Sequence, residues 1–268
     1  MRKEISLMLD VDVVPLTVTF NGKTYKDGFG GVLKKLFFSR LRSGAIEPVT
    51  SQPSPDEFFT VFNKHKQQGN EVVYIGISSR SSGTLQAARI ARSMCDYEHI
   101  HIVDSYNLSH GLEALVRTAC RLRDHGYSAK EIVRKINELV PKVKSVSVVE
   151  SMRFLNRGGR VQTEELSGHN SLSLKNLVAI CDGRFTPVAT ARGRAGAFEK
   201  IYKMMSESHI NDKLPVILTH SDCREGVRRL ENFLVSKGMD FEYIHSEIGS
   251  VIGTHFGPDT VGIAYVEK

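Results

Sequence analysis

The sequence predicts an α/β protein of two domains, in which short apolar strands alternate with amphipathic helices. The first observation is a set of short runs rich in β-branched residues, which are typical of buried strands. The second is a set of longer stretches whose apolar residues recur every three or four positions, as on one face of a helix. The third is the pair Asp182-Gly183 between two apolar runs, which predicts an antiparallel hairpin in the second half.

The first half alternates strands and helices, which favours a mostly parallel sheet flanked by helices. Ser54 precedes Glu57 by three positions and Ser128 precedes Glu131 by three, so each pair forms a capping box that marks a helix start. The predicted strands cover residues 13–20, 71–78 and 99–105. The predicted helices start at Pro55 or cover residues 83–94, 109–126 and 128–140.

The second half contains a hairpin as well as helix-linked strands, so we expect a mixed sheet with helices. One amphipathic helix is predicted over residues 225–238 and ends at Gly238. The change of pattern near residue 145 predicts two α/β domains, 1–145 and 146–268. The predicted strands cover residues 144–151, the hairpin at 176–189, and residues 213–220, 241–246 and 261–267.

The composition is that of a globular protein, with 41% hydrophobic and 25% charged residues among 268. No apolar run approaches the length of a membrane span, and the N-terminal stretch lacks the apolar core of a signal peptide. The four cysteines are scattered without a metal-ligand spacing, which favours reduced thiols in a cytoplasmic protein and no metal site. The net charge of +6 permits a polyanionic partner, but the sequence shows no basic-aromatic platform, which disfavours nucleic acid.

A first polar loop precedes a helix in the stretch PVTSQPSPDEF, residues 48–58. Ser54 is taken up by helix capping. Thr50, Ser51 and Gln52 have no such local task, and hydroxyl groups beside a positive helix end suit an anion. An ordinary polar turn is the alternative.

A second polar loop, ISSRSSGTLQAA at residues 77–88, joins a strand to a helix. Ligands of open α/β sheets bind outside the carboxyl ends of the strands, which is where Ser82 and Gly83 are expected. The Ser82 hydroxyl supplies a donor, and Gly83 lets a ligand approach the backbone. Simple capping of the helix by Ser81 or Ser82 is the alternative. The loop has neither the lysine of a Walker loop nor the GxSxG pattern of a nucleophile elbow.

A third stretch, GSVIGTHFGPDTVG at residues 249–262, is predicted to be a glycine-rich loop between two strands. Its four glycines indicate unusual backbone conformations or a close approach by another group. His255 in this loop is predicted to donate to an anion, with a turn histidine bonded to backbone as the alternative.

Arg160 and Arg192 belong to two basic stretches, RFLNRGGR and TARGR, that suit either phosphate recognition or a solvated surface.

Taken together, these stretches resemble the DegV family of fatty acid-binding proteins. The resemblance covers nearly the whole chain and is carried, in family order, by VVPLTVTFNGKTYKDG, PVTSQPSPDEF, ISSRSSGT, IVDSYNLSHGL, RFLNRGGR, DGRFTPVATARGR and VIGTHFGPDTVG. It implies two α/β domains with an acyl chain buried in a tunnel between them. It also implies that Thr50, Ser82 and His255 hold the carboxyl head group, with Ser51 and Gly83 beside them.

The resemblance further implies a lipid-binding carrier without catalytic residues, metal or cofactor of its own. Such a protein binds a long-chain fatty acid and presents the carboxyl group to a separate fatty acid kinase, which uses ATP and magnesium to form an acyl phosphate for phospholipid metabolism. Arg160 and Arg192 would face the kinase or a phosphate. An acyltransferase and the membrane surface would be transient partners. The alternative is a stand-alone hydrolase or phosphotransferase that uses Ser82 and His255.

Two departures from the family pattern affect the expected tunnel. The resemblance implies a strand and a polar loop ahead of residues 13–20, whereas this chain starts with the helix that should follow them. A missing strand would expose a sheet edge or open the tunnel. Arg80 stands where a smaller residue is usual, which would alter the tunnel entrance.

Overall fold

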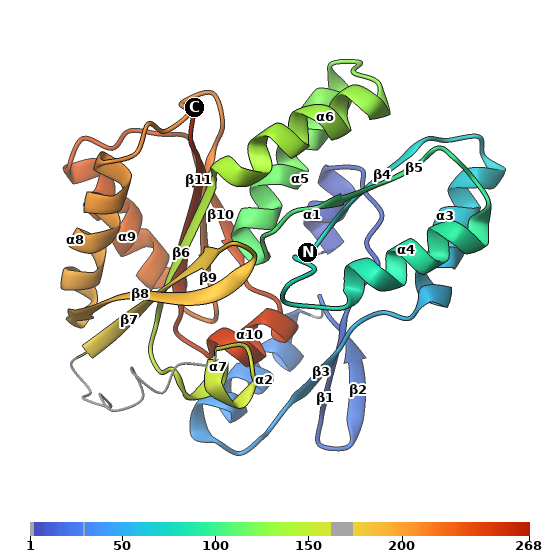
Figure 1. Ribbon diagram of the computed structural model, residues 1–268. Helices are drawn as coiled ribbons and strands as arrows, with labels where there is room; N and C mark the ends of the chain where they lie inside the picture. Colours follow the sequence, from blue (N-terminus) through green and yellow to red (C-terminus); the bar gives the residue numbers. More distant parts are fainter. Residues whose placement is uncertain (1–2, 29, 162–173) are drawn as a thin grey trace.

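The computed structural model describes residues 3–28, 30–161 and 174–268, which form an α/β fold of three sheets with flanking helices (Figure 1). The helices are α1 (Lys3–Met8), α2 (Gly31–Ser43), α3 (Pro55–Gln67), α4 (Thr84–Cys95), α5 (Ser109–Asp124), α6 (Ala129–Leu139), α7 (Arg153–Arg157), α8 (Gly193–Ser206), α9 (Arg224–Ser236) and α10 (Ser250–Phe256), with a 3-10 turn at Val140–Lys142. The strands are β1 (Thr17–Phe20), β2 (Lys23–Lys26), β3 (Val49–Ser51), β4 (Val72–Gly76), β5 (Ile100–Asp104), β6 (Val143–Val149), β7 (Leu174–Cys181), β8 (Arg184–Arg192), β9 (Val216–His220), β10 (Tyr243–Glu247) and β11 (Val261–Val266).

A mixed six-stranded sheet dominates the described part of the second half (Figure 1). Its order is β10-β9-β11-β6-β7-β8, with β10 parallel to β9 and the other neighbours antiparallel. Leu218 of β9 packs towards α8 and α9, and its neighbour Ile217 packs towards α5, because side chains alternate between the faces of a strand. The predicted hairpin turn is confirmed at Asp182 and Gly183, with φ values of 48° and 75°.

The sheets of the first half are smaller. Strands β4 and β5 run parallel, with α3 and α4 on one face and α5 and α6 on the other. This part confirms the predicted α/β class. A separate antiparallel sheet, β2-β1-β3, was not foreseen. Its first turn is Asn21-Gly22, with φ values of 49° and 70°, and this dipeptide is a strong hairpin signal that the expected strand–helix alternation obscured.

Both predicted capping boxes are confirmed. The Ser54 hydroxyl accepts from the Glu57 amide, and the Glu57 carboxylate accepts from the Ser54 amide, at the start of α3. Ser128 and Glu131 make the same reciprocal pair at the start of α6. These bonds involve only neighbouring residues, which is why the sequence predicted the two helix starts so closely.

The prediction of a glycine-rich loop at residues 249–262 is wrong, because this stretch contains the helix α10. Its first turn is capped by the Asp27 carboxylate, which accepts from the Ser250 amide at 2.7 Å. This cap comes from a residue far away in the chain, so no local pattern revealed it. Gly257 ends the helix at φ 80°, where a Cβ would lie 2.3 Å from the Phe154 ring. The expected close approach to a glycine therefore does occur there.

The proposed division of the chain at residue 145 stays a prediction. Strand β6, which contains that position, pairs with β11 and β7 in the six-stranded sheet. Helix α5, which precedes the division, contacts both this sheet and β4. The two halves therefore share a common apolar layer around α5.

Candidate functional site

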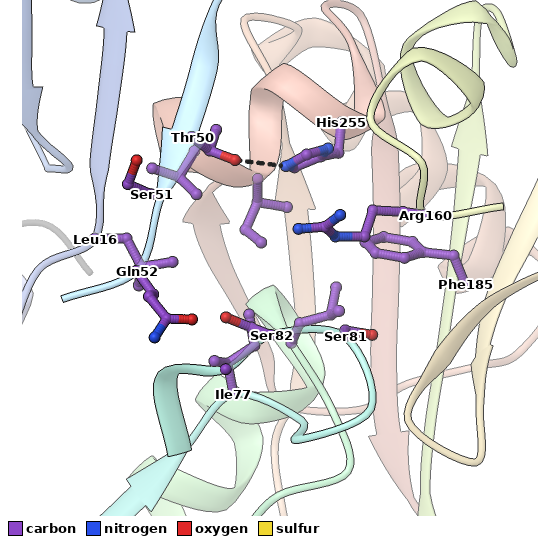
Figure 2. A pocket seen from close by; sticks show the side chains of 14 residues that line it. Leu16, Thr50, Ser51, Gln52, Ile77, Ser81, Ser82, Arg160, Phe185 and His255 are labelled. Atoms are coloured by element: carbon purple, nitrogen blue, oxygen red, sulfur yellow. Dashed lines mark hydrogen bonds between the residues drawn. The ribbon is translucent and has the colours of Figure 1, made fainter. Parts of the chain in front are cut away.

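A pocket of about 310 Å³ lies where the residues after β3 and β4 meet α10 (Figure 2). Its lining combines hydroxyl, amide, imidazole and guanidinium groups with apolar side chains. The lining residues are Leu16, Thr50, Ser51, Gln52, Ile77, Ser81, Ser82, Gly83, Leu108, Arg160, Phe185, Val251, Ile252 and His255. We call this the head-group pocket.

The residues predicted to hold a carboxyl group all line this pocket, although they come from three distant parts of the chain. Thr50 and Ser51 belong to β3, Ser82 and Gly83 precede α4, and His255 belongs to α10. The fold thus brings these five residues together. Their role in holding a carboxyl group stays a prediction.

His255 is a buried side chain, with 8% of its surface exposed. Its Nε2 lies 3.1 Å from the Thr50 hydroxyl (Figure 2), and its Nδ1 is buried without a hydrogen-bond partner in the described parts of the chain. Burial, together with the positive charges of Arg160 and Arg157, lowers the pKa of His255 to about 4. The imidazole is therefore neutral near pH 7, and it contributes a hydrogen bond to the pocket rather than a charge.

One tautomer of His255 fits these contacts best. A neutral imidazole has a single N–H donor. With the proton on Nε2, His255 donates to the Thr50 oxygen and leaves the Thr50 hydroxyl proton free for the pocket. The other tautomer would bury an unpaired N–H at Nδ1, and buried donors without partners are rarer than buried acceptors without partners. We assign the Nε2–H tautomer, so Thr50 becomes a donor for an acceptor in the pocket.

The N-terminal end of α4 faces the same pocket. Ser82 Oγ accepts from the Thr84 amide at 3.3 Å and lies 2.8 Å from the Thr84 hydroxyl. Capping is therefore part of its role, but a hydroxyl has one donor and two acceptor sites and can make a further bond. At Gly83 a Cβ would lie 2.3 Å from Oε1 of Gln52, so the absence of a side chain lets that amide rest on the helix end. Negative groups are stabilised at such an end.

Arg160 adds positive charge to the head-group pocket. Its guanidinium points into the pocket in Figure 2, and Nη1 donates to the Gly158 carbonyl at 2.9 Å. Arg192 is exposed at the end of β8 and is not among the described lining residues. Arg194, from the same basic stretch, is held by the Glu150 carboxylate at 2.7 Å. The structure therefore places Arg160 in the wall of the head-group pocket and Arg192 on the surface, away from the described lining residues.

A larger hollow of about 720 Å³ adjoins the head-group pocket. The two share Leu16, Ile77, Val251 and Ile252. Side chains of α1, α3, β4, α5 and α6 contribute to the walls of the hollow, and most of these are apolar. A polar pocket that continues into an apolar hollow suits an amphipathic molecule with one polar end and a long apolar tail.

The β7–β8 hairpin packs against the loop that precedes α4. Arg80 forms an ion pair with Asp182 and lies over the Tyr106 ring, 5.4 Å from its centroid. The Ser81 hydroxyl donates to the Gly183 carbonyl at 2.6 Å. These contacts, which we call the hairpin latch, join the two halves of the chain beside the head-group pocket.

The structure describes the ranges 3–28, 30–161 and 174–268. Within these ranges, no group of three or more His, Cys, Asp or Glu side chains is placed to hold a metal ion. Nor does any helix there combine the length and the apolar character needed to cross a bilayer.

Sequence reasoning missed several lining residues. The sequence marks Gln52 as a polar side chain without a local task, but its contact with Gly83 depends on the fold. Leu108 and Phe185 also line the pocket, and both are buried like ordinary core residues. An apolar residue of a cavity wall has the same sequence signal as one in a filled core, so no pattern could have identified them.

The fold and the two adjoining cavities define an α/β protein with a polar pocket beside a mostly apolar hollow. The chain belongs to the DegV family, since a family model described as "Uncharacterised protein, DegV family" matches residues 1–268. A DegV domain-containing protein of Caldanaerobacter subterraneus subsp. tengcongensis is 36% identical over 258 residues, which are 96% of this chain and 91% of that protein. A fatty acid-binding protein of Thermotoga maritima is 31% identical over 258 residues, covering 94% of this chain and 89% of that protein.

Solved structures show the same fold. The crystal structure of a DegV lipid binding protein from Thermotoga maritima matches with a TM-score of 0.88 and 28% identity, over 100% of this chain and 94% of that chain. A DegV family protein from Thermus thermophilus, whose structure is described by its fatty acid binding, matches with a TM-score of 0.88 and 27% identity, over 100% and 96% of the two chains. These matches confirm the predicted family and fold class.

Proposed function

We propose that this protein is a fatty acid carrier. It binds a long-chain fatty acid with the carboxyl group in the head-group pocket and the acyl chain in the adjoining hollow. The single observation that carries the proposal is that a polar, positively charged pocket and an apolar hollow share one wall. Relatives described as fatty acid-binding proteins support the same ligand class.

The head group is held by donors rather than by a metal. Thr50, oriented by His255, donates to one carboxylate oxygen, and Ser82 donates to the carboxylate beside the end of α4. Arg160 supplies the opposite charge and favours the ionised acid. Hydrogen bonds to a charged group contribute about 1.5–3 kcal/mol each, so these donors discriminate an acid from an uncharged lipid.

The acyl chain supplies most of the affinity. Each buried methylene contributes about 0.8 kcal/mol, so about fourteen methylenes give roughly 11 kcal/mol before the cost of ordering the chain. The walls of the hollow are mostly apolar, as this requires. The head group therefore determines orientation and selectivity, while the tail determines how tightly the acid is held.

The carrier serves a separate enzyme. In this proposal a cytoplasmic fatty acid kinase takes the presented carboxyl group and uses ATP and magnesium to make an acyl phosphate, which an acyltransferase consumes. The carrier touches the membrane surface transiently to load its ligand. Arg160 in the pocket and Arg192 on the surface are the residues proposed to face the kinase or the new phosphate.

A stand-alone hydrolase or phosphotransferase is not favoured. A nucleophile and its base must share a hydrogen bond. Ser82 is bonded to Thr84, and Nε2 of His255 is bonded to Thr50, so Ser82 and His255 make no such contact among the described bonds. The protein incubated alone with ester substrates or with ATP is expected to show no turnover.

A comparison of ligands tests the proposed function. The protein is expected to bind palmitate more tightly than the alcohol of the same chain length, because only the acid offers a carboxylate to Thr50, Ser82 and Arg160. Ser82→Ala and Thr50→Val each reduce this preference by about tenfold or more, since each removes a bond to a charged group. Titration calorimetry or displacement of a fluorescent acid measures both affinities.

The control for this comparison is Ser93→Ala, because Ser93 is exposed on α4 and its hydroxyl donates to the Arg89 carbonyl of that helix. It should leave the acid-to-alcohol preference unchanged. A protein that takes up neither ligand, or binds both equally well, contradicts the proposed function.

The hairpin latch gives a kinetic prediction. Arg80→Ala removes the ion pair with Asp182 and the contact with Tyr106, each worth up to about 1 kcal/mol at an exposed position. Fatty acid is expected to dissociate roughly fivefold faster, because the loop beside the pocket opens more easily. Stopped-flow release of a fluorescent fatty acid measures this rate. Arg89→Ala on the exposed face of α4 is the control, and equal rates for both variants contradict the latch.

A further inference from the structure

The imidazole of His255 rests directly against Gly158, the residue that follows α7. A Cβ on Gly158 would lie 2.2 Å from Nδ1 of His255 and 2.9 Å from its Cε1. Both distances are shorter than packed atoms tolerate, so a side chain at position 158 displaces the imidazole. The ring is buried, and its Nε2 lies 3.1 Å from the Thr50 hydroxyl. Because the ring is rigid, a displacement at Nδ1 also moves Nε2 relative to Thr50.

The backbone of Gly158 does not itself require glycine. Its φ of −72° and ψ of −4° are open to residues with a side chain. The next residue, Gly159, has a φ of 61°, and this left-handed conformation is the one that commonly follows a helix. The end of α7 therefore accounts for Gly159, and the contact with His255 is left as the structural reason for Gly158.

Helices α7 and α10 make a second contact of the same kind. The Phe154 ring of α7 lies over Gly257, where a Cβ would be 2.3 Å from the ring. Each helix thus places a ring against the glycine that follows the other helix. A packed core resists compression, so these two contacts fix the distance between the helices and, with it, the position of the imidazole.

The contact with Gly158 also bears on the proton of the imidazole. Nδ1 is buried and has no hydrogen-bond partner among the residues that the structure describes. The gap between Gly158 and Nδ1 is too small for a methyl group. A proton on Nδ1 would therefore stay unpaired, whereas a proton on Nε2 is bonded to Thr50.

We propose that Gly158 is a positioning residue for the head-group pocket. Its lack of a side chain lets His255 take the place from which Nε2–H donates to Thr50, and this bond leaves the Thr50 hydroxyl proton free for a ligand. This role rests on the proposed function, because that ligand is the carboxylate of a fatty acid. The Gly158 carbonyl also accepts from Nη1 of Arg160 at 2.9 Å, so the same residue holds the guanidinium of the pocket.

The tautomer of His255 tests this role without any ligand. Nitrogen-15 NMR separates protonated from unprotonated ring nitrogens of histidine, and His255→Gln identifies the signals of His255 by their loss. Near neutral pH the unchanged protein is expected to carry the proton on Nε2. In Gly158→Ala the fraction with the proton on Nδ1 is expected to rise by about fivefold, which corresponds to the loss of one hydrogen bond between neutral groups.

Gly196→Ala is the matched control for this measurement. Gly196 lies in α8, and a Cβ there would lie 3.6 Å from Cβ of Ala191, which is an ordinary contact. This variant should leave the His255 signals unchanged.

A double variant shows whether Gly158 acts through His255. Gly158→Ala alone is expected to lower the preference for palmitate over the alcohol of the same chain length by about tenfold, since Thr50 loses its orientation. His255→Ala removes the ring that the new methyl group displaces. In that background Gly158→Ala should cause no further loss of preference and no further loss of stability towards urea. General overpacking of the core would persist in the double variant and is thereby distinguished.

An unchanged tautomer ratio in Gly158→Ala overturns the role of Gly158. An equal loss of preference with and without the imidazole also overturns it, because Gly158 then acts through another group. If Gly158→Ala alone fails to fold, a folded double variant supports the role and an unfolded one overturns it. A protein without any preference for the acid contradicts the proposed function instead, and the tautomer ratio still decides the role of Gly158.

Discussion

Replacing Leu16 with tryptophan is expected to lower the affinity for palmitate by about 100-fold. Leu16 lines both the head-group pocket and the hollow, so a bulky indole there obstructs the passage between them. An acid that enters the pocket but cannot extend its tail loses about 0.8 kcal/mol for each methylene left outside. Three or four excluded methylenes remove about 3 kcal/mol, which corresponds to the stated loss.

The length of the ligand separates this effect from damage to the pocket. The affinity for hexanoate should change little in Leu16→Trp, because a short tail does not reach the hollow. Val188→Trp is the matched control, since Val188 is 40% exposed on β8 and lines neither cavity in the described structure. Titration calorimetry measures both acids. If Leu16→Trp binds palmitate as the unchanged protein does, the acyl chain takes another route.

The protein is expected to lose much of its stability between about pH 6.5 and pH 4, because three buried histidines are neutral in the folded state. Burial lowers the pKa of His110, His220 and His255 to about 4 from an ordinary value of 6.5. The unfolded chain therefore binds protons at a higher pH than the folded chain does. The contribution of the three histidines to stability is fully present above pH 6.5 and is lost as the pH falls towards and through their pKa in the folded state.

The size of the expected loss of stability follows from the pKa shifts of the three histidines. At about pH 5 each histidine lowers the free energy of unfolding by about 2 kcal/mol relative to neutral pH, and the three together lower it by about 6 kcal/mol. That is a large part of the total stability of about 5–15 kcal/mol that is usual for folded proteins. Urea unfolding at neutral pH and at about pH 5 measures the difference.

Single variants apportion the acid sensitivity. The free energy of unfolding differs between neutral pH and about pH 5. His110→Gln and His255→Gln should each reduce this difference by about 2 kcal/mol, because glutamine does not titrate. His125→Gln is the control, since His125 is exposed at the end of α5. A difference that is unchanged in both buried variants shows that other groups cause the acid loss.

The elements that the sequence predicted well depend on neighbours in the chain. Ser54 and Ser128 cap helices through bonds three residues away, and Asp182-Gly183 makes a turn through its own backbone angles. The polar loops were also recognised, because hydroxyl and glycine residues after a strand are conspicuous. The antiparallel β2-β1-β3 sheet was missed, since alternating strands and helices suggested parallel pairing throughout.

The elements that the sequence predicted poorly depend on distant residues. The four glycines around His255 predict a loop, whereas the structure has the helix α10, whose start is capped by the distant residue Asp27. That error changed the surroundings of His255, which is buried in a helix and bonded to Thr50 rather than exposed in a turn. Arg160 and Arg192 looked equivalent as basic side chains, but only Arg160 lines the described pocket.

The sequence by itself determined the family, the α/β class and the five residues of the predicted head-group site, because short motifs carry these in consecutive residues. Only the tertiary structure decided that those residues share one pocket and that the pocket adjoins an apolar hollow. A cavity is a property of the space between elements. Its walls come from separate parts of the chain, and an apolar wall residue has the same local pattern as a packed one.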